Sequence, residues 1–283
     1  MNRQRPVAAH LVASLAIACV MLAGCHPAPA RMDPGTAQDV AVSIQGEIDF
    51  VADWETGDWS PFPQVACKPE QFAAVTHPVR QGVYSARFTV RPGDKWGGYS
   101  GERCELAREY REFEGDEYYY GWSTLFPADW TAPAYYGIIL QWHSPAPISP
   151  PIAISASGSE LEVQVETGDI DGGAGEYRQN TTVLNSLELG TWHDFIIHIK
   201  FQSRYTGFIE LWHRLEGDAD FSLIYSQRNI PTLQRSAAEP GAYERAYIQH
   251  GFYRGDGGSN TNVVYQDNLR RGTTYDVVRA AFP

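Results

Sequence analysis

Runs of residues in which apolar and polar positions alternate, or in which Val, Ile and aromatic residues dominate, recur through most of the chain. An alternation with a period of two is typical of a β-strand with one buried face. Clusters of Pro and Gly separate the runs, and no long stretch has a clear helical period. We therefore predict strands at residues 83–91, 118–126, 136–143, 161–166, 194–201, 208–213, 221–225, 246–253 and 263–269.

This pattern predicts an all-β fold, a two-sheet antiparallel jelly-roll sandwich of the concanavalin-like type. No break in composition divides residues 40–283, and all-β sandwiches of about this length are commonly single domains. We therefore expect one domain over 40–283. The Gly-rich segments 171–175 and 255–258 suit either the flexible lips of a cleft or ordinary hairpin loops.

The first 39 residues have a different character. Arg3 and Arg5 precede an apolar stretch at 11–22 that is too short to span a bilayer. The run Leu22-Ala23-Gly24-Cys25 that follows resembles the lipobox of bacterial lipoproteins. The resemblance implies a signal peptide at 1–24, a lipid anchor on Cys25 and a Pro- and Ala-rich tether over 25–39. A plain signal peptide and a buried amino-terminal strand are the alternatives.

Export is the expected fate of such a chain. His26 follows the cysteine where an Asp would favour retention in the inner membrane, so the resemblance implies the outer membrane, on its periplasmic or cell-surface side. With Cys19 removed and Cys25 lipidated, Cys67 and Cys104 remain. We favour a disulfide between them, because such a bond persists in an oxidising compartment, over two separate buried thiols.

The net charge of −12 excludes a general binder of polyanions, and no nucleic-acid-binding motif is present. Only three of the 22 basic residues are lysines, at 68, 95 and 200, and the rest are arginines. Arginine favours paired contacts to carboxylates over diffuse attraction. An acidic ligand would therefore need a locally basic cleft.

Two short strand segments each place polar side chains on one face. In 101–106, Arg103 and Glu105 share a face because they are two residues apart. In 141–143, Gln141 and His143 share a face, and Trp142 turns toward the core. A third segment, 247–253, repeats the arrangement with Tyr247, Gln249 and Tyr253 on its polar face.

These segments resemble those of polysaccharide lyases of the β-jelly-roll type, closest to the heparin lyase I-like and glucuronan lyase group and related to the alginate lyases. The matching motifs are Arg103-Cys104-Glu105-Leu106, Gln141-Trp142-His143 and Gly251-Phe252-Tyr253-Arg254. Each motif is weak alone, but the three in this order are fairly specific. The resemblance covers about residues 50–272.

The resemblance implies cleavage of a uronate-containing polysaccharide by β-elimination. Arg103 and Gln141 would neutralise the substrate carboxylate, as an oxyanion hole stabilises its charge. His143 and Tyr253 would transfer protons, and the stereochemistry at C5 decides whether His143 or Tyr253 is the base. Further substrate contacts are expected from Tyr247, Gln249, Arg254, Glu105 and Lys95.

Two departures from the family pattern leave the polymer open. The family often has Lys where this chain has Gln249, and the alginate enzymes carry a second Arg where it has Ala107. We expect no organic cofactor and a monomer attached to the membrane only through its lipid. A structural calcium ion held by Glu55 and Asp267 is a further expectation, since both offer hard oxygen ligands, although solvated loop acids are the simpler reading.

Each assignment has a simpler alternative. His143 suits a structural histidine, Arg103 suits a simple ion pair with Glu105, and the tyrosines suit cross-strand packing. At the level of function, the main alternative is a carbohydrate-binding sandwich without catalysis. A glycoside hydrolase comes third, since Glu47-Ile48-Asp49-Phe50 resembles part of the acid pair of sandwich hydrolases.

Overall fold

The computed structural model describes residues 44–109, 111–171 and 175–283. The signal peptide (1–24), the lipidated Cys25 and the tether (25–39) lie outside these ranges and remain predictions. No helix within the described ranges has both the length and the apolar character that crossing a membrane requires. The helical elements described are η1 (Pro69–Gln71) and α1 (Tyr275–Arg279).

The remaining elements are strands, as the alternating pattern predicts. The predicted runs did not include the strands at 48–52, 64–66, 72–75, 112–113, 152–157, 177–184 and 234–235. The strands are β1 (Ile48–Ala52), β2 (Gln64–Ala66), β3 (Phe72–Val75), β4 (Ser85–Val90), β5 (Glu102–Ala107), β6 (Glu112–Phe113), β7 (Glu117–Leu125), β8 (Gly137–His143), β9 (Ile152–Ser157), β10 (Glu160–Asp169), β11 (Tyr177–Leu184), β12 (Trp192–Lys200), β13 (Gly207–Leu215), β14 (Ser222–Ile230), β15 (Gln234–Arg235), β16 (Arg245–Arg254) and β17 (Asn262–Gly272).

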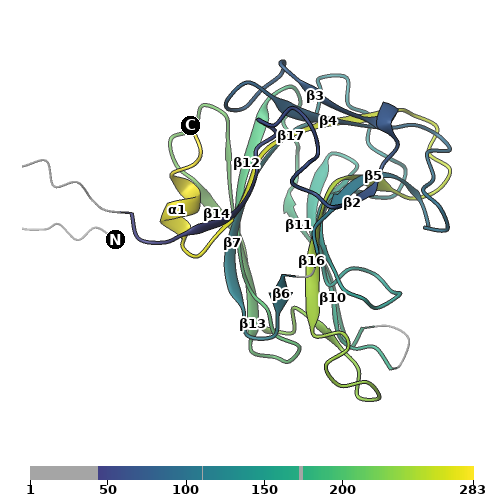
Figure 1. Ribbon diagram of the computed structural model, residues 1–283, viewed down its shortest axis with the longest axis vertical. Coiled ribbons are helices and arrows are strands. Elements are labelled where there is room, and N and C mark those ends of the chain that lie inside the picture. Colours follow the sequence, from purple (N-terminus) through teal and green to yellow (C-terminus); the bar gives the residue numbers. More distant parts are fainter. Residues whose placement is uncertain (1–43, 110, 172–174) are drawn as a thin grey trace, which may run out of the picture. The chain divides into compact units, whose positions relative to one another are not determined.

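The strands form two facing sheets (Figure 1). The eight-stranded sheet has the order β14-β13-β12-β7-β17-β4-β3, with β1 on β17. The nine-stranded sheet has the order β11-β10-β9-β8-β16-β5-β2, with β15 on β10 and β6 on β16. The pairings are antiparallel except for β10 with β15. The predicted two-sheet antiparallel jelly roll is confirmed.

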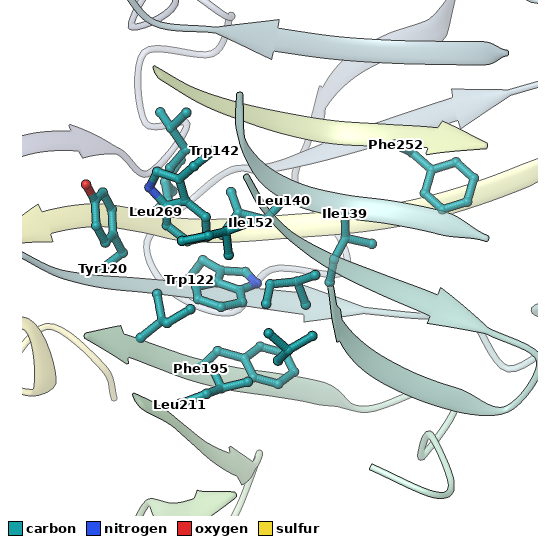
Figure 2. Close-up of a cluster of buried hydrophobic side chains, with 14 of the residues drawn as sticks. Tyr120, Trp122, Ile139, Leu140, Trp142, Ile152, Phe195, Leu211, Phe252 and Leu269 are labelled. Carbon is teal, nitrogen blue, oxygen red and sulfur yellow. The ribbon is translucent and has the colours of Figure 1, made fainter. Parts of the chain in front are cut away.

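The inner faces of the two sheets meet in one apolar core (Figure 2). Trp122 of β7 stacks on Phe195 of β12 at 4.9 Å between ring centres, within the eight-stranded sheet. Tyr120 of β7 meets Trp142 of β8 edge-on at 5.0 Å and so joins the two sheets. Trp142 is fully buried, as its alternation with Gln141 and His143 predicts. Truncating one such aromatic side chain typically costs about 3–5 kcal/mol of stability.

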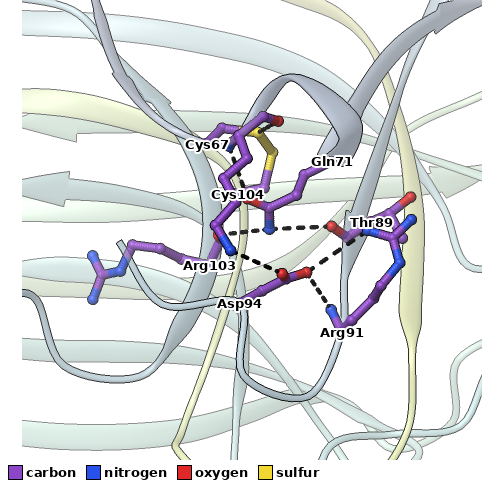
Figure 3. Close-up of a disulfide and its surroundings, with 8 residues drawn as sticks. Cys67, Gln71, Thr89, Arg91, Asp94, Arg103 and Cys104 are labelled. Carbon is purple, nitrogen blue, oxygen red and sulfur yellow. Dashed lines mark hydrogen bonds and ion pairs between the residues drawn. A yellow bond between two sulfur atoms is a disulfide. The ribbon is translucent and has the colours of Figure 1, made fainter. Parts of the chain in front are cut away.

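A disulfide joins Cys67, just after β2, to Cys104 of β5, 37 residues later (Figure 3). Both half-cystines are buried in the core. Around them, the side chain of Gln71 donates to the backbone oxygens of Thr89 and Arg103 at 3.4 and 3.0 Å. The backbone N–H of Arg103 donates to the Asp94 carbonyl at 2.9 Å. Strand β5 is thus fixed from its core side.

Candidate active site

A cleft of about 650 Å³ lies on the nine-stranded sheet. Its walls come from β5, β8, β10, β11 and β16 and from the three loops before β5, before β8 and after β8. The residues that line it are Gly98, Tyr99, Ser100, Arg103, Tyr136, Ile138, Gln141, His143, Pro147, Ile148, Ser149, Pro150, Gln164, Val165, Glu166, Arg178, Asn180, Tyr247, Gln249 and Tyr253.

Strand register brings the residues predicted from three separate motifs into this one cleft. Strand β16 lies between β5 and β8, so its polar face has a neighbour on each side. Tyr247 pairs with His143, and Gln249 pairs with Gln141. On the other edge, Tyr253 pairs with Arg103. The polar faces inferred from alternation are therefore parts of one surface.

Arg103 is 7% exposed and has its guanidinium stacked on the ring of Tyr253, 3.9 Å from the ring centre. Its Nη1 donates to Glu105 at 3.1 Å, and its Nη2 donates to the Ser100 carbonyl at 2.5 Å. Its Nε is buried and has no partner among the described residues. These bonds hold the cation in place and use only two of its five N–H donors.

Glu105 lies behind the cleft surface rather than in it. Its carboxylate is 2% exposed and accepts from Arg103 and, at 2.5 Å, from Nε2 of Gln141. Burial raises the pKa of Glu105, against the lowering effects of Arg103 and Gln141. The predicted role in substrate binding is therefore corrected: Glu105 joins Arg103 and Gln141 and fixes both, because the side chain of Gln141 covers it.

His143 ends β8 at the cleft surface. Its Nδ1 lies 2.6 Å from the Ser144 carbonyl, which can only accept, so Nδ1 carries the hydrogen and Nε2 keeps a lone pair. Burial lowers the pKa of His143, the nearby Arg103 lowers it further, and the bond to Ser144 opposes both. The imidazole is consequently neutral near pH 7, in the state that a general base needs.

The hydroxyl of Tyr253 has two partners that the sequence did not predict. Tyr136 donates to it at 2.9 Å from the loop before β8, and Ser100 Oγ lies 3.2 Å away. Tyr99 packs against Arg103 from the same side, with 5.4 Å between the guanidinium carbon and the ring centre. Tyr99 and Ser100 are in a loop, where alternation predicts no direction for a side chain. Tyr136 begins the predicted strand 136–143 but lies just before β8, and strict alternation would have placed it on the face opposite Gln141.

The residues at the far end of the cleft were also not predicted from the sequence. Gln164 and Glu166 of β10 pair with Asn180 and Arg178 of β11. Arg178 lies 3.4 Å from Glu166, and its side chain is 69% exposed. The alternating polar positions of β10 were available as a signal, but β11 was not among the predicted strands.

Two predicted substrate contacts lie elsewhere. Arg254 is 1% exposed and pairs with Glu102 at 2.8 Å, on the face of β16 opposite Tyr253. Strand alternation requires this, since the two residues are neighbours. Lys95 forms an exposed ion pair with Asp256 at 3.0 Å and does not line the cleft.

The residues expected to hold calcium do not fit the ion. Glu55 accepts backbone N–H bonds from Val83 and Tyr84 at about 2.9 Å. Asp267 accepts from the backbone of Arg80 and Gln81 at 2.9 and 3.1 Å. Oxygens directed at N–H donors are not arranged around a cation. In the described part of the chain, no cluster of three metal-binding side chains occurs.

Asp49, from the run 47–50 that resembles part of the acid pair of sandwich hydrolases, forms a structural ion pair. Asp49 of β1 forms a two-point ion pair with Arg271 on the eight-stranded sheet, away from the cleft. Among the described residues that line the cleft, Glu166 is the one acid. A pair of carboxylates across a scissile bond, which glycoside hydrolases commonly use, is not formed by these lining residues.

Comparison with known proteins gives one family match. The family described as polysaccharide lyase matches residues 54–270. A search of curated protein sequences found no match.

Several solved structures share the fold. Endo-beta-1,4-glucuronan lyase from the fungus Trichoderma reesei is 19% identical, with a TM-score of 0.63 over 78% of this chain and 95% of that chain. A GH131 beta-glucanase catalytic domain from Podospora anserina is 14% identical, with a TM-score of 0.52 over 81% and 97% of the two chains. An alginate lyase in complex with alginate trisaccharide is 11% identical, with a TM-score of 0.52 over 78% and 96%. Because one of the three is a glucanase, the shared fold alone does not decide the reaction.

Proposed function

The chain belongs to the polysaccharide lyase family, and from this premise we propose that it cleaves a uronate-containing polysaccharide by β-elimination in the cleft of β5, β8 and β16. The observation that carries the proposal is the convergence of Arg103, Gln141, His143 and Tyr253 on one cleft. The product would carry a 4,5-unsaturated uronate at its new end.

Elimination has two chemical requirements that these side chains meet. The proton at C5 is very weakly acidic while the neighbouring carboxylate keeps its charge, so that charge must be neutralised. Arg103 and Gln141 line the cleft and keep N–H groups that their bonds to Ser100 and Glu105 do not use, and Glu105 holds both side chains in place. Such pre-positioned donors stabilise the enolate-like transition state more than the ground state.

The proton transfers follow from the same geometry. His143 Nε2 takes the C5 proton where that proton and the leaving group lie on opposite faces of the sugar, as in guluronate-like or iduronate-like units. Tyr253 gives its proton to the C4 oxygen as the C4–O4 bond breaks and the C4–C5 double bond forms. In glucuronate-like or mannuronate-like units, Tyr253 is positioned to perform both transfers.

The test is a panel of uronate polysaccharides incubated with the protein, with the ultraviolet absorbance of the unsaturated product followed over time. We expect one polymer to react and His143→Ala and Tyr253→Phe to lose at least about 100-fold in kcat, the order of a general acid or base contribution. Lys95→Ala, at an exposed ion pair outside the cleft, is the control and should keep wild-type activity.

Binding without any rise in absorbance would instead favour the non-catalytic carbohydrate-binding alternative. Product without the conjugated double bond would favour a hydrolase. Either result overturns the proposed elimination.

A further inference from the structure

Tyr136 stands at the edge of the cleft, in the loop before β8, and its contacts converge on a single partner. Its hydroxyl donates to the hydroxyl of Tyr253 at 2.9 Å, and the two rings meet edge-on at 5.4 Å. Two further neighbours contact the Tyr253 ring. The Arg103 guanidinium lies on its face, and a side chain at Gly101 would lie 2.3 Å from it.

This arrangement fixes where the Tyr253 proton points. A phenol oxygen that accepts from Tyr136 directs its own O–H elsewhere, because a donated hydrogen already occupies the side facing Tyr136. Ser100 Oγ, at 3.2 Å, is farther away than in an ordinary O–H···O bond, so it holds the Tyr253 O–H only weakly. The Tyr253 O–H is therefore available to an oxygen of the substrate.

We propose that Tyr136 is a positioning residue for the reaction, which aims the Tyr253 proton at the leaving oxygen and stabilises the Tyr253 phenolate once that proton has gone. The inference rests on the proposed function and goes beyond it by assigning a role to a loop residue outside the three strand motifs.

The step balances as follows. The Tyr253 O–H bond breaks and its proton goes to O4, while the C4–O4 bond pair leaves with that oxygen. The C5–H pair becomes the second bond between C4 and C5, and the C5 proton goes to the base. Negative charge then develops on the Tyr253 oxygen, where the hydrogen bond from Tyr136 becomes a charge-assisted one and so gains strength.

Tyr136 is suited to remain a donor throughout. Burial raises its pKa, and so does its bond to Tyr253; Arg103 opposes this shift and Asp256 adds to it. Its hydroxyl therefore stays protonated at any pH at which the fold operates.

The experiment compares Tyr136→Phe with the wild type on the polymer that the wild type cleaves. The phenylalanine keeps the edge-on ring contact and removes only the donor. Tyr135→Phe is the matched control, because it makes the same change at the adjacent position, whose side chain is 71% exposed and does not line the cleft. We expect kcat of Tyr136→Phe to fall roughly 10–100-fold, somewhat less than the loss of a main oxyanion donor, since Ser100 remains.

Two further readouts separate positioning from damage to the fold. The KM should stay within about two-fold of the wild type, because the lost bond matters most in the transition state. The solvent deuterium isotope effect on kcat should rise in Tyr136→Phe alone, because transfer of the Tyr253 proton becomes more limiting. A loss of folded protein would lower kcat without changing the isotope effect.

The inference is overturned if Tyr136→Phe keeps wild-type kcat, if only its KM changes, or if the isotope effect stays constant. If the wild type cleaves no uronate polymer, the proposed function itself has failed and this role falls with it. Cleavage by the wild type with no effect of Tyr136→Phe rejects the role of Tyr136 alone.

Discussion

Three side chains from two strands form the charged centre of the site: Arg103, Glu105 and Gln141. Alternation along β5 predicted that Arg103 and Glu105 share a face, and it predicted the face of Gln141 on β8. It could not show that Gln141 covers Glu105. That contact joins two strands that are not neighbours in the sheet, because β16 lies between them. Its two residues are 36 positions apart in the chain.

Glu105→Leu should therefore damage the fold as well as the chemistry. It leaves the Arg103 cation buried without its carboxylate, and breaking a buried pair in this way typically costs roughly 3–5 kcal/mol. Chemical denaturation at pH 7 measures this loss directly. The double variant Arg103→Leu/Glu105→Leu should recover much of the stability but no activity, because no uncompensated charge remains. A double variant less stable than Glu105→Leu would refute this account.

At the scale of the element, β16 has an irregular backbone within the site. Its register with β8 shifts between His250 and Tyr253, whereas its register with β5 stays regular. Gly251 lies in this shift with a φ of 146°, and a Cβ there would be 2.2 Å from the Cys104 carbonyl oxygen. The sequence predicted the strand and its faces, but not the shift, because local alternation contains no information about the partner strand.

Gly251→Ala should force β16 and β5 apart. We expect a loss of roughly 1–3 kcal/mol in unfolding free energy, as for other overpacked sites, and a large loss of kcat because Tyr253 moves relative to Arg103. Gly257→Ala is the matched control, since Gly257 also has a positive φ, 81°, but open space around it. Equal losses in the two variants would show that backbone strain, and not the collision, limits position 251.

For the molecule as a whole, the fold class followed from the sequence because a two-residue period over many segments admits few other architectures. The polar face that lines the cleft followed from the three motifs. The contacts of Tyr136 and of the loop residue Lys95 did not follow from local alternation. The role expected of Arg254 was wrong for another reason, since alternation along β16 already turns it away from Tyr253. Both cations form ion pairs outside the cleft, Lys95 with Asp256 and Arg254 with Glu102.

The core also contains an acid-sensitive group, His250, whose ring stacks on Trp54 at 5.9 Å. Neither of its nitrogens has a partner among the described residues, and burial lowers its pKa to about 3. Since its folded-state pKa lies below its ordinary value of about 6.5, protonation favours the unfolded chain in the window between them. Stability supplied by neutral His250 is thus present above pH 6.5 and lost as the pH falls toward 3.

His250→Phe should remove this sensitivity while keeping an aromatic ring in place. Relative to the variant, the wild type should lose about 3 kcal/mol of unfolding free energy between pH 7 and pH 4, at 1.36 kcal/mol for each pKa unit. Denaturant titrations of both proteins at pH 7, 5 and 4 measure the gap. A gap that stays constant over this range would show that His250 does not titrate in this way.

The disulfide at Cys104 has a consequence for how this protein tolerates change. Buried charges such as Arg103 and Glu105 cost several kcal/mol each in desolvation, and they flank Cys104 on the same strand. A cross-link over 37 residues contributes about 4 kcal/mol in the chain-entropy account, and it acts from the opposite face of β5. Because this contribution acts through the unfolded chain, it does not depend on which side chains occupy the outer face of β5. The cross-link thus offsets part of the desolvation cost of Arg103 and Glu105, the two buried charges that the proposed site requires on this strand.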